Sequence, residues 1–215
     1  MSELSKYFTN AFSHSYKSKT PDEYVFQRGD YRFSVLSSRI IRVEKDEKRI
    51  FTDEATQTVI CRDFDRPQFG FSQDNNKIVI KTDDIIFRFD LSKGKTESIT
   101  LNDSRCVTNF KAGNLKGTYR TLDMINGSVR LGDGLMSTNG VSVVDDSKTV
   151  IVSTDGTLKE RRHIQKDEYY FAFGNDFRGC LKDFFKLCGS VPLVPRYCLG
   201  NWWSRFYRYN EESYL

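Results

Sequence analysis

The sequence predicts a mainly β protein: an antiparallel β-sandwich, followed by one helix and the beginning of a parallel α/β domain. Three observations carry this prediction. Apolar residues alternate with polar ones through the first half of the chain. Turn-forming clusters separate these runs at intervals of about ten residues, which is typical of a sandwich. One stretch near residue 180 has helical spacing instead.

The strands are predicted from apolar residues that recur with period two. The polar turn at residues 73–76 and the breaker at residues 92–95 separate strands that we expect to form hairpins. Further strands are predicted at residues 149–152 and 169–173. The alternating sets in the first half are Tyr31, Phe33 and Val35; Ile41 and Val43; Val59 and Cys61; Ile78 and Ile80; and Ile85, Phe87, Phe89 and Leu91.

Between residues 113 and 140 the composition changes, because six glycines alternate there with asparagine and aspartate. This composition predicts long ordered loops and turns. Such loops on a β scaffold often carry function, although structural turns that join strands account for the same pattern equally well.

One helix is predicted over residues 176–188. Asp176 can cap it, its apolar residues form a single stripe that includes Cys180 and Cys188, and Gly189 ends it. Two prolines, at 192 and 195, then exclude helix and mark a linker. Residues 197–204 are predicted to form a mostly buried strand, and residues 210–215 have the cap and acidic first turn of a helix.

Composition excludes several classes of protein. With 33 Lys and Arg against 29 Asp and Glu, the net charge of +4 is too small for a strongly basic nucleic-acid binder. No stretch approaches the roughly 20 apolar residues of a membrane span, and the N-terminus lacks the apolar core of an export signal. The five cysteines are odd in number and form no CxxC pair, so we expect reduced thiols, a cytoplasmic location and no zinc site.

The chain offers few residues for catalysis. Adjacent acids at 83–84, 145–146 and 211–212 are poorly placed to flank one glycosidic bond, and we expect turn or helix-start roles for them. His14 and His163 have no nucleophile beside them. The mixed-charge runs 44–49 and 159–162 are interpreted as hydrated hairpin faces. Six aromatic residues between 202 and 214 could stack on sugar rings or pack in a core, and we favour the core for Trp202 and Trp203.

Two segments resemble family 31 of the glycoside hydrolases, the α-glucosidases and α-xylosidases. Residues 191–205 (VPLVPRYCLGNWWSR) resemble the family's linker and first barrel strand. Residues 114–123 (NLKGTYRTLD), with Gly127 and the stretch 131–147, are similar to the loop region of its N-terminal sandwich. The resemblance covers residues 110–215 well, whereas residues 1–110 agree only in being rich in strands.

The resemblance implies a galactose-mutarotase-like sandwich at 1–175, a bridging helix and linker at 176–195, and the start of a truncated (β/α)₈ barrel at 196–215. It also implies a retaining enzyme without metal or organic cofactor. The family's catalytic aspartates lie on later barrel strands, so this chain is expected to hold no catalytic residue. Asp123 matches a sugar-contacting aspartate of the sandwich loop, and Phe206 or Tyr207 matches an aromatic residue of the same pocket.

The sequence therefore predicts the N-terminal part of an α-glycosidase that acts on α-linked oligosaccharides or glycosides and is inactive alone. Neither nucleic acid nor membrane is expected as a partner, and oligomeric state is left open. One alternative is a carbohydrate-binding sandwich that works without catalysis. Another is a gene fragment without function of its own, which would expose aromatic residues of its C-terminal segment.

Overall fold

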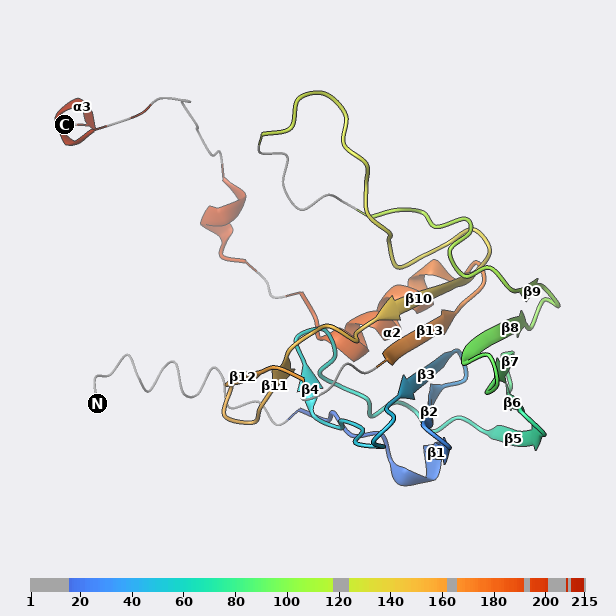
Figure 1. The fold of residues 1–215 in the computed structure, drawn as a ribbon. Coiled ribbons are helices and arrows are strands. Elements are labelled where there is room, and N and C mark those ends of the chain that lie inside the picture. Colours follow the sequence, from blue (N-terminus) through green and yellow to red (C-terminus); the bar gives the residue numbers. More distant parts are fainter. Residues whose placement is uncertain are drawn as a thin grey trace.

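A computed structural model of the chain describes residues 16–117, 124–161, 166–191, 194–200, 208 and 210–214. Within these ranges the protein is built mainly from antiparallel strands, in two five-stranded sheets and one three-stranded sheet. Figure 1 shows the two larger sheets side by side, with the second sheet at the right of the view. The prediction of an antiparallel sandwich followed by a helix is confirmed.

Strands that follow one another in sequence are neighbours throughout the second sheet but not throughout the first. The first sheet inserts β13 (Lys166–Ala172) between β3 (Ile40–Lys45) and β10 (Val141–Asp145), and begins with β1 (Val25–Arg28) and β2 (Tyr31–Ser37). The second sheet is a simple meander of β5 (Phe69–Asp74), β6 (Lys77–Thr82), β7 (Ile85–Asp90), β8 (Lys95–Leu101) and β9 (Cys106–Val107). The small sheet joins β4 (Ala55–Thr56), β11 (Ile151–Val152) and β12 (Leu158–Lys159).

The main hydrophobic core lies between the two larger sheets. Edge-to-face ring pairs cross it: the ring centroids of Phe33 and Phe89 are 5.1 Å apart, and those of Phe87 and Tyr170 are 5.4 Å apart. The alternating residues predicted for β2, β3, β6 and β7 fill this core because period-two spacing places them on one face of each strand. Its fully buried members include Phe33, Ile41, Val43, Ile78, Ile80, Phe87, Phe89 and Ile99.

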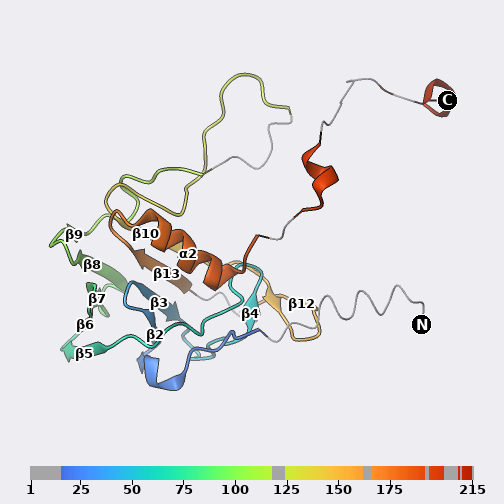
Figure 2. The same ribbon diagram turned by 180° about the vertical axis from the view of Figure 1, so that it is seen from behind.

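Helix α2 (Phe177–Cys188) covers part of the opposite face of the first sheet, as Figure 2 shows from behind. The Asp176 carboxylate accepts a hydrogen bond from the Gly179 backbone at 2.9 Å, and Gly189, with φ of 89°, ends the helix. Cys180 and Leu187 are buried in a second core with residues of β13. The predicted cap and stop are confirmed. The predicted stripe is divided, because Cys180 is buried whereas Phe177, Leu181 and Phe185 of the same stripe are partly exposed.

The predicted hairpin turns are also confirmed. β5 and β6 are joined through Asn75 and Asn76, with Asn75 in the left-handed region at φ of 50°. Gly94, at φ of 62°, turns β7 into β8, and a Cβ there would collide with the Tyr31 hydroxyl.

One predicted strand is wrong. Val59 and Cys61 lie outside any strand, and the strand of that region is β4 instead. The backbone N–H groups of Ile60 and Cys61 both donate to the Leu187 carbonyl, at 2.9 and 3.0 Å, so this segment is bonded to the end of α2. Val59 is buried because it packs in the second core.

A second correction concerns the chain after the linker. Arg196–Leu199 form the 3₁₀ helix η2 rather than the start of a buried strand, and its residues are not buried. A lone strand has no ladder partner for its backbone groups, and no strand in the described residues lies against this segment. The predicted helix start is confirmed as α3 (Glu211–Tyr214), where Asn210 accepts from the Ser213 backbone at 2.7 Å. A second 3₁₀ turn, η1 (Asp22–Tyr24), precedes β1.

We expect Ile80→Ala to lower the free energy of unfolding by about 2–5 kcal/mol, because the fully buried side chain leaves a cavity between the sheets. Urea denaturation measures the loss. The matched control is Leu158→Ala in β12, an exposed position where we expect a change within about 0.5 kcal/mol. Equal losses at both positions would contradict this placement of the core.

Candidate functional site

The residues predicted to contact sugar lie outside the described ranges. These are Asp123, Phe206 and Tyr207; His14, His163, Trp202 and Trp203 also fall outside them. The structure does describe the segments that flank Asp123. We call residues 113–117 and 124–140 the glycine-rich lobe. Asp123 lies in sequence between these two limbs of the lobe.

The two limbs of the lobe are hydrogen-bonded at its base. The Thr138 backbone donates to the Gly113 carbonyl at 2.8 Å, and the Gly117 backbone donates to the Gly132 carbonyl at 2.8 Å. An isolated antiparallel bridge joins Asn114 to Ser137 between these bonds. The prediction of an ordered loop region is confirmed for the described residues of the lobe.

Asn114 is the central residue of this base. Its Oδ1 accepts from the backbone N–H groups of Lys116 and Gly134, both at 2.8 Å, and its Nδ2 donates to the Gly134 carbonyl at 2.9 Å. Gly134 is required there because a Cβ would lie 2.6 Å from the Lys116 carbonyl oxygen. Asn139 then anchors the lobe to the preceding loop through the carbonyls of Asn109 and Ala112, at 3.0 and 2.9 Å.

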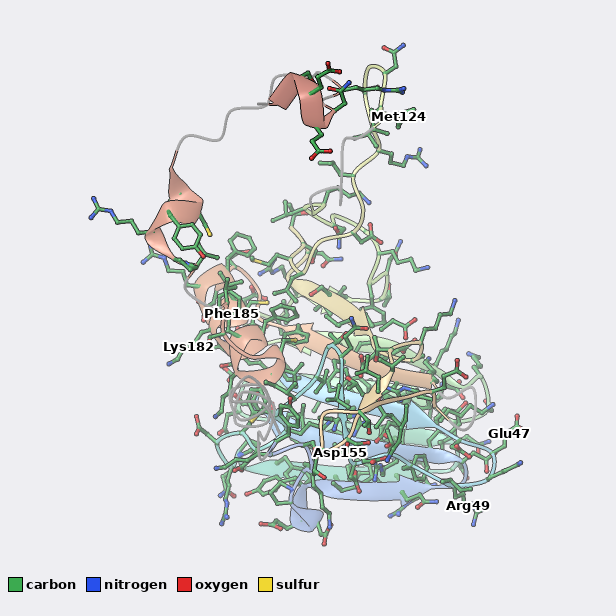
Figure 3. All side chains as sticks on the ribbon, turned by 90° about the vertical axis from the view of Figure 1, so that its left-hand side faces the viewer. Glu47, Arg49, Met124, Asp155, Lys182 and Phe185 are labelled. Atoms are coloured by element: carbon green, nitrogen blue, oxygen red, sulfur yellow. The ribbon has the colours of Figure 1, made fainter. Side chains whose placement is uncertain are left out.

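The lobe extends away from the sandwich. Figures 1 and 2 show its outer part beyond the edges of both larger sheets, and Figure 3 labels Met124 far from the strands. Met124 is fully exposed, and Leu115 and Leu131 are about half exposed. The lobe therefore places its outer residues, which adjoin Asp123 in sequence, beyond the body of the domain on an anchored base.

A second constellation consists of buried charges on the outer face of the first sheet, in the part of that face that α2 does not cover. At its centre, Nε and Nη2 of Arg42 each donate to one oxygen of Asp167 at 2.8 Å. Arg32 binds Glu44 in the same two-pronged way, at 2.6 and 2.9 Å. Together the side chains form a series of alternating charge that we call the charge ladder: Asp53, Arg32, Glu44, Arg42, Asp167, Arg161 and Asp146.

Burial and pairing act in opposite directions on these groups. Burial alone would raise the pKa of Asp167, but the adjacent Arg42 guanidinium holds that pKa at about 2. For Glu44 and Asp146 burial prevails, and it raises the pKa of each carboxyl above its ordinary value. Burial would lower the pKa of Arg42, yet Asp167 and Glu44 raise it, so Arg42 stays charged.

The charge ladder corrects the interpretation of the two mixed-charge runs. Glu44 and Arg161 were expected on hydrated faces, but both lie almost fully buried in the ladder. Perturbed pKa values often mark catalytic sites, but here each buried carboxylate is engaged by guanidinium groups of the same network. A neighbouring cleft of about 460 Å³ is lined by Asp53 and by no other ladder residue. The ladder therefore serves the fold rather than a reaction.

A further cleft, of about 470 Å³, lies between the sheets' loops and the start of α2. Arg39 lines it and is bound to Asp84 at 3.1 Å and to Asp176 at 2.8 Å, with its guanidinium 5.5 Å from the Phe173 ring centroid. The turn role expected for the acids at 83–84 is confirmed, because they join β6 to β7. No residue of the lobe lines this cleft.

The five cysteines all lie in the described ranges, and no disulfide joins them there. Burial raises the pKa of Cys180 and of Cys188 to about 12, so both stay protonated in the second core. In the described ranges no group of three or more His, Cys, Asp or Glu side chains is arranged to hold a metal ion. No helix in the described part of the chain is long and apolar enough to cross a bilayer.

Comparison with known proteins gives structural matches only. No family model and no curated protein matches the sequence. Two solved structures align with most of this chain but only about a third of their own length. The glycoside hydrolase family 31 dextranase of Flavobacterium johnsoniae, complexed with glucose, is 13% identical, with a TM-score of 0.44, over 87% of this chain and 30% of that one. A family 31 α-xylosidase from a soil metagenome, complexed with xylose, is 10% identical, with a TM-score of 0.49, over 82% and 35%.

We expect Asn114→Ala to speed tryptic cleavage beside Lys116 and Arg130 at least about fivefold, because the base of the lobe loses three hydrogen bonds. The cleavage rate is measured by mass spectrometry under native conditions. Asn102→Ala, in the exposed β8–β9 turn, is the matched control and should leave the rate unchanged. An unchanged rate in the Asn114 variant would show that the lobe is held by other contacts.

We expect Asp167→Asn to lower the free energy of unfolding at pH 7 by about 3–5 kcal/mol, because Arg42 loses its charged partner in a buried site. The folded-state pKa of Asp167, about 2, lies below its unfolded value of about 3.9. The carboxylate therefore contributes stability above the unfolded pKa, and this contribution disappears as the pH falls through the folded one.

The difference between wild type and Asp167→Asn should accordingly be full near pH 7 and shrink toward pH 2 in urea titrations. The control Asp133→Asn breaks an exposed pair with Lys116 and should cost less than about 1 kcal/mol. A difference for Asp167 that did not change with pH would contradict the assigned pKa.

Proposed function

We propose that this chain is the N-terminal part of a family-31-type α-glycosidase that acts on α-glucosides or α-xylosides, and that it does not hydrolyse them alone. The observation that carries the proposal is the sequence resemblance of residues 114–123, 131–147 and 191–205, in the family's order and spacing. The proposed parts are a sandwich at 1–175, a bridging helix and linker at 176–195, and the start of a barrel at 196–215. An α-linked oligosaccharide is the proposed ligand of the full-length enzyme.

Exposed apolar residues after α2 support a missing second domain. Val191, Val194, Tyr197 and Leu199 are between 53% and 77% exposed, and all lie within nine residues of one another. A run of apolar side chains of this kind marks a surface that another part of a protein covers. Further barrel strands and helices beyond residue 215 would supply that cover.

The proposed sugar contacts are Asp123 and either Phe206 or Tyr207. Asp123 directly precedes Met124 in the sequence of the lobe. Asn114 joins the two limbs at the base of the lobe, and Asn139 bonds that base to the preceding loop. A carboxylate accepts hydrogen bonds from sugar hydroxyls, and an aromatic ring stacks on the apolar face of the sugar. A hydrogen-bonded base supports such a role because it fixes where the lobe leaves the domain.

The described acids support the absence of hydrolysis by this chain. A retaining glycosidase needs two carboxyl groups about 5–5.5 Å apart that flank one bond. Asp84 is bound to Arg39, and Asp146 is bound to Arg161 and to Thr56. Both carboxylates are thus engaged by side chains of the fold, and neither is paired with a second carboxyl group that could flank a sugar bond. We therefore propose that the catalytic aspartates lie on barrel strands beyond residue 215, and we propose no metal or organic cofactor.

We expect the purified 215-residue chain to release no p-nitrophenol from p-nitrophenyl α-glucoside or α-xyloside above a heat-denatured sample. Absorbance assays measure the release, with the Asp123→Ala variant as control. Turnover by the wild type that Asp123→Ala abolishes would contradict the proposal. It would show that this chain contains a complete active site.

Calorimetry separates the proposal from a stand-alone binding module. Titration of the chain with maltose or isoprimeverose at millimolar concentration should show no binding that depends on Asp123, because the remaining pocket residues belong to the barrel. Binding that Asp123→Ala removes would instead favour a carbohydrate-binding sandwich without catalysis.

A further inference from the structure

Helix α2 keeps a partly exposed apolar stripe on its flank, beside the face that packs into the second core. Phe177, Leu181 and Phe185 are 40%, 38% and 37% exposed. They are four residues apart, so they form one row along the helix, which we call the outer stripe. Figure 3 labels Phe185 and Lys182 on this helix. The outer stripe is distinct from Cys180 and Leu187, which pack into the second core.

The outer stripe is matched in length and pattern by the beginning of the chain. Residues 4–12 lie outside the described ranges, and their sequence has apolar residues at i, i+3, i+4, i+7 and i+8, the spacing of one helical face. As a helix, this segment would be about 12 Å from first to last residue, which equals the length of the row from Phe177 to Phe185. Its apolar residues are Leu4, Tyr7, Phe8, Ala11 and Phe12.

The described chain begins beside the end of α2. The Arg62 backbone donates to the Lys17 carbonyl at 2.7 Å, and the neighbouring Cys61 backbone donates to the Leu187 carbonyl at 3.0 Å. An ion pair between Lys17 and Asp63, at 3.1 Å, holds the same place. Lys17 and the last turn of α2 are thus bonded to adjacent residues of one segment.

The connection is long enough for the two apolar rows to meet. Lys17 follows Phe12 by five positions in sequence, and an extended chain of five steps spans up to about 17 Å. Phe12 can therefore reach Phe185, one turn before the end of α2, and Leu4 can reach Phe177 at its start.

We propose that residues 4–12 form an amphipathic helix that docks on the outer stripe of α2. Burial of the two apolar rows against each other drives the contact, and the bonded position of Lys17 makes it an intramolecular one. The proposal does not depend on the glycosidase function. It makes the N-terminal segment part of the domain's fold, as the cover of its bridging helix.

Photo-cross-linking of the full chain tests the proposal. p-Benzoylphenylalanine in place of Phe8 should cross-link to the peptide that contains residues 177–188, identified by mass spectrometry. The same group in place of Thr9, on the polar side of the pattern, is the matched control and should give at least about fivefold less of this product. Leu181→Asp should reduce the yield from position 8 by a similar factor, whereas Leu158→Asp should not.

Mixing ¹⁴N- and ¹⁵N-labelled chains before irradiation distinguishes the possible occupants. Products within one isotope class support docking in the same chain. Mixed-isotope products would overturn the proposal, because a second copy would then cover the stripe. Equal yields from positions 8 and 9, or no product on 177–188 from position 8, would overturn it as well.

Discussion

The pairing of Arg42 with Asp167 is the constraint on which the rest of the domain depends. Both side chains are almost fully buried, and a charge taken out of water is stable only when its partner is in place. Asp167 lies opposite Glu44 in the β13–β3 ladder, and Tyr169 lies opposite Arg42. A slip of one residue in the strand pairing would move these charged side chains to the other face of the sheet, where the hydrophobic core lies. The charge ladder thus specifies the register in which β13 inserts beside β3.

The same pairing determines what covers the outer face of the first sheet. Over the charged half lie residues 52–54. The Thr52 carbonyl accepts from Arg32 and Arg42 at 3.2 and 3.3 Å, and the Glu54 carbonyl accepts from Arg62 at 2.9 Å. Over the apolar half lies α2. The Arg62 guanidinium joins the two halves, because its Nε donates to the Tyr169 hydroxyl at 2.7 Å. Arg62 therefore ties the segment over the charged half to the strand that α2 covers.

This arrangement explains why the domain has apolar surface at one end. The outer stripe of α2 and the exposed residues of 191–199 follow one another along the chain. In our proposals they have different covers: the first is the chain's own N-terminal segment, and the second is a barrel that follows in the full-length enzyme. The anchored lobe extends beyond the sheets as well (Figure 2).

The sequence by itself determined the strands that form the main core and the helix that follows them. β2, β3, β6, β7 and β13 were predictable because one face of each is buried against apolar side chains, and this leaves a period of two in the sequence. β1, β5, β8 and β10 were not predicted from the pattern, because strands such as β8 (Lys95–Leu101) are rich in polar residues and are placed by their neighbours. The lobe was predictable as ordered loop, whereas the roles of Asp123, Phe206 and Tyr207 stay predictions that rest on resemblance.

Only the tertiary structure decided where the charges lie. Glu44 and Arg161 belong to runs that are mixed in sign and polar throughout, and such runs are usually hydrated. Their burial depends on partners far away in sequence, since Arg42 and Asp167 are 125 residues apart. No local pattern records a contact of that range. A buried charge is tolerated only when the whole network is assembled around it.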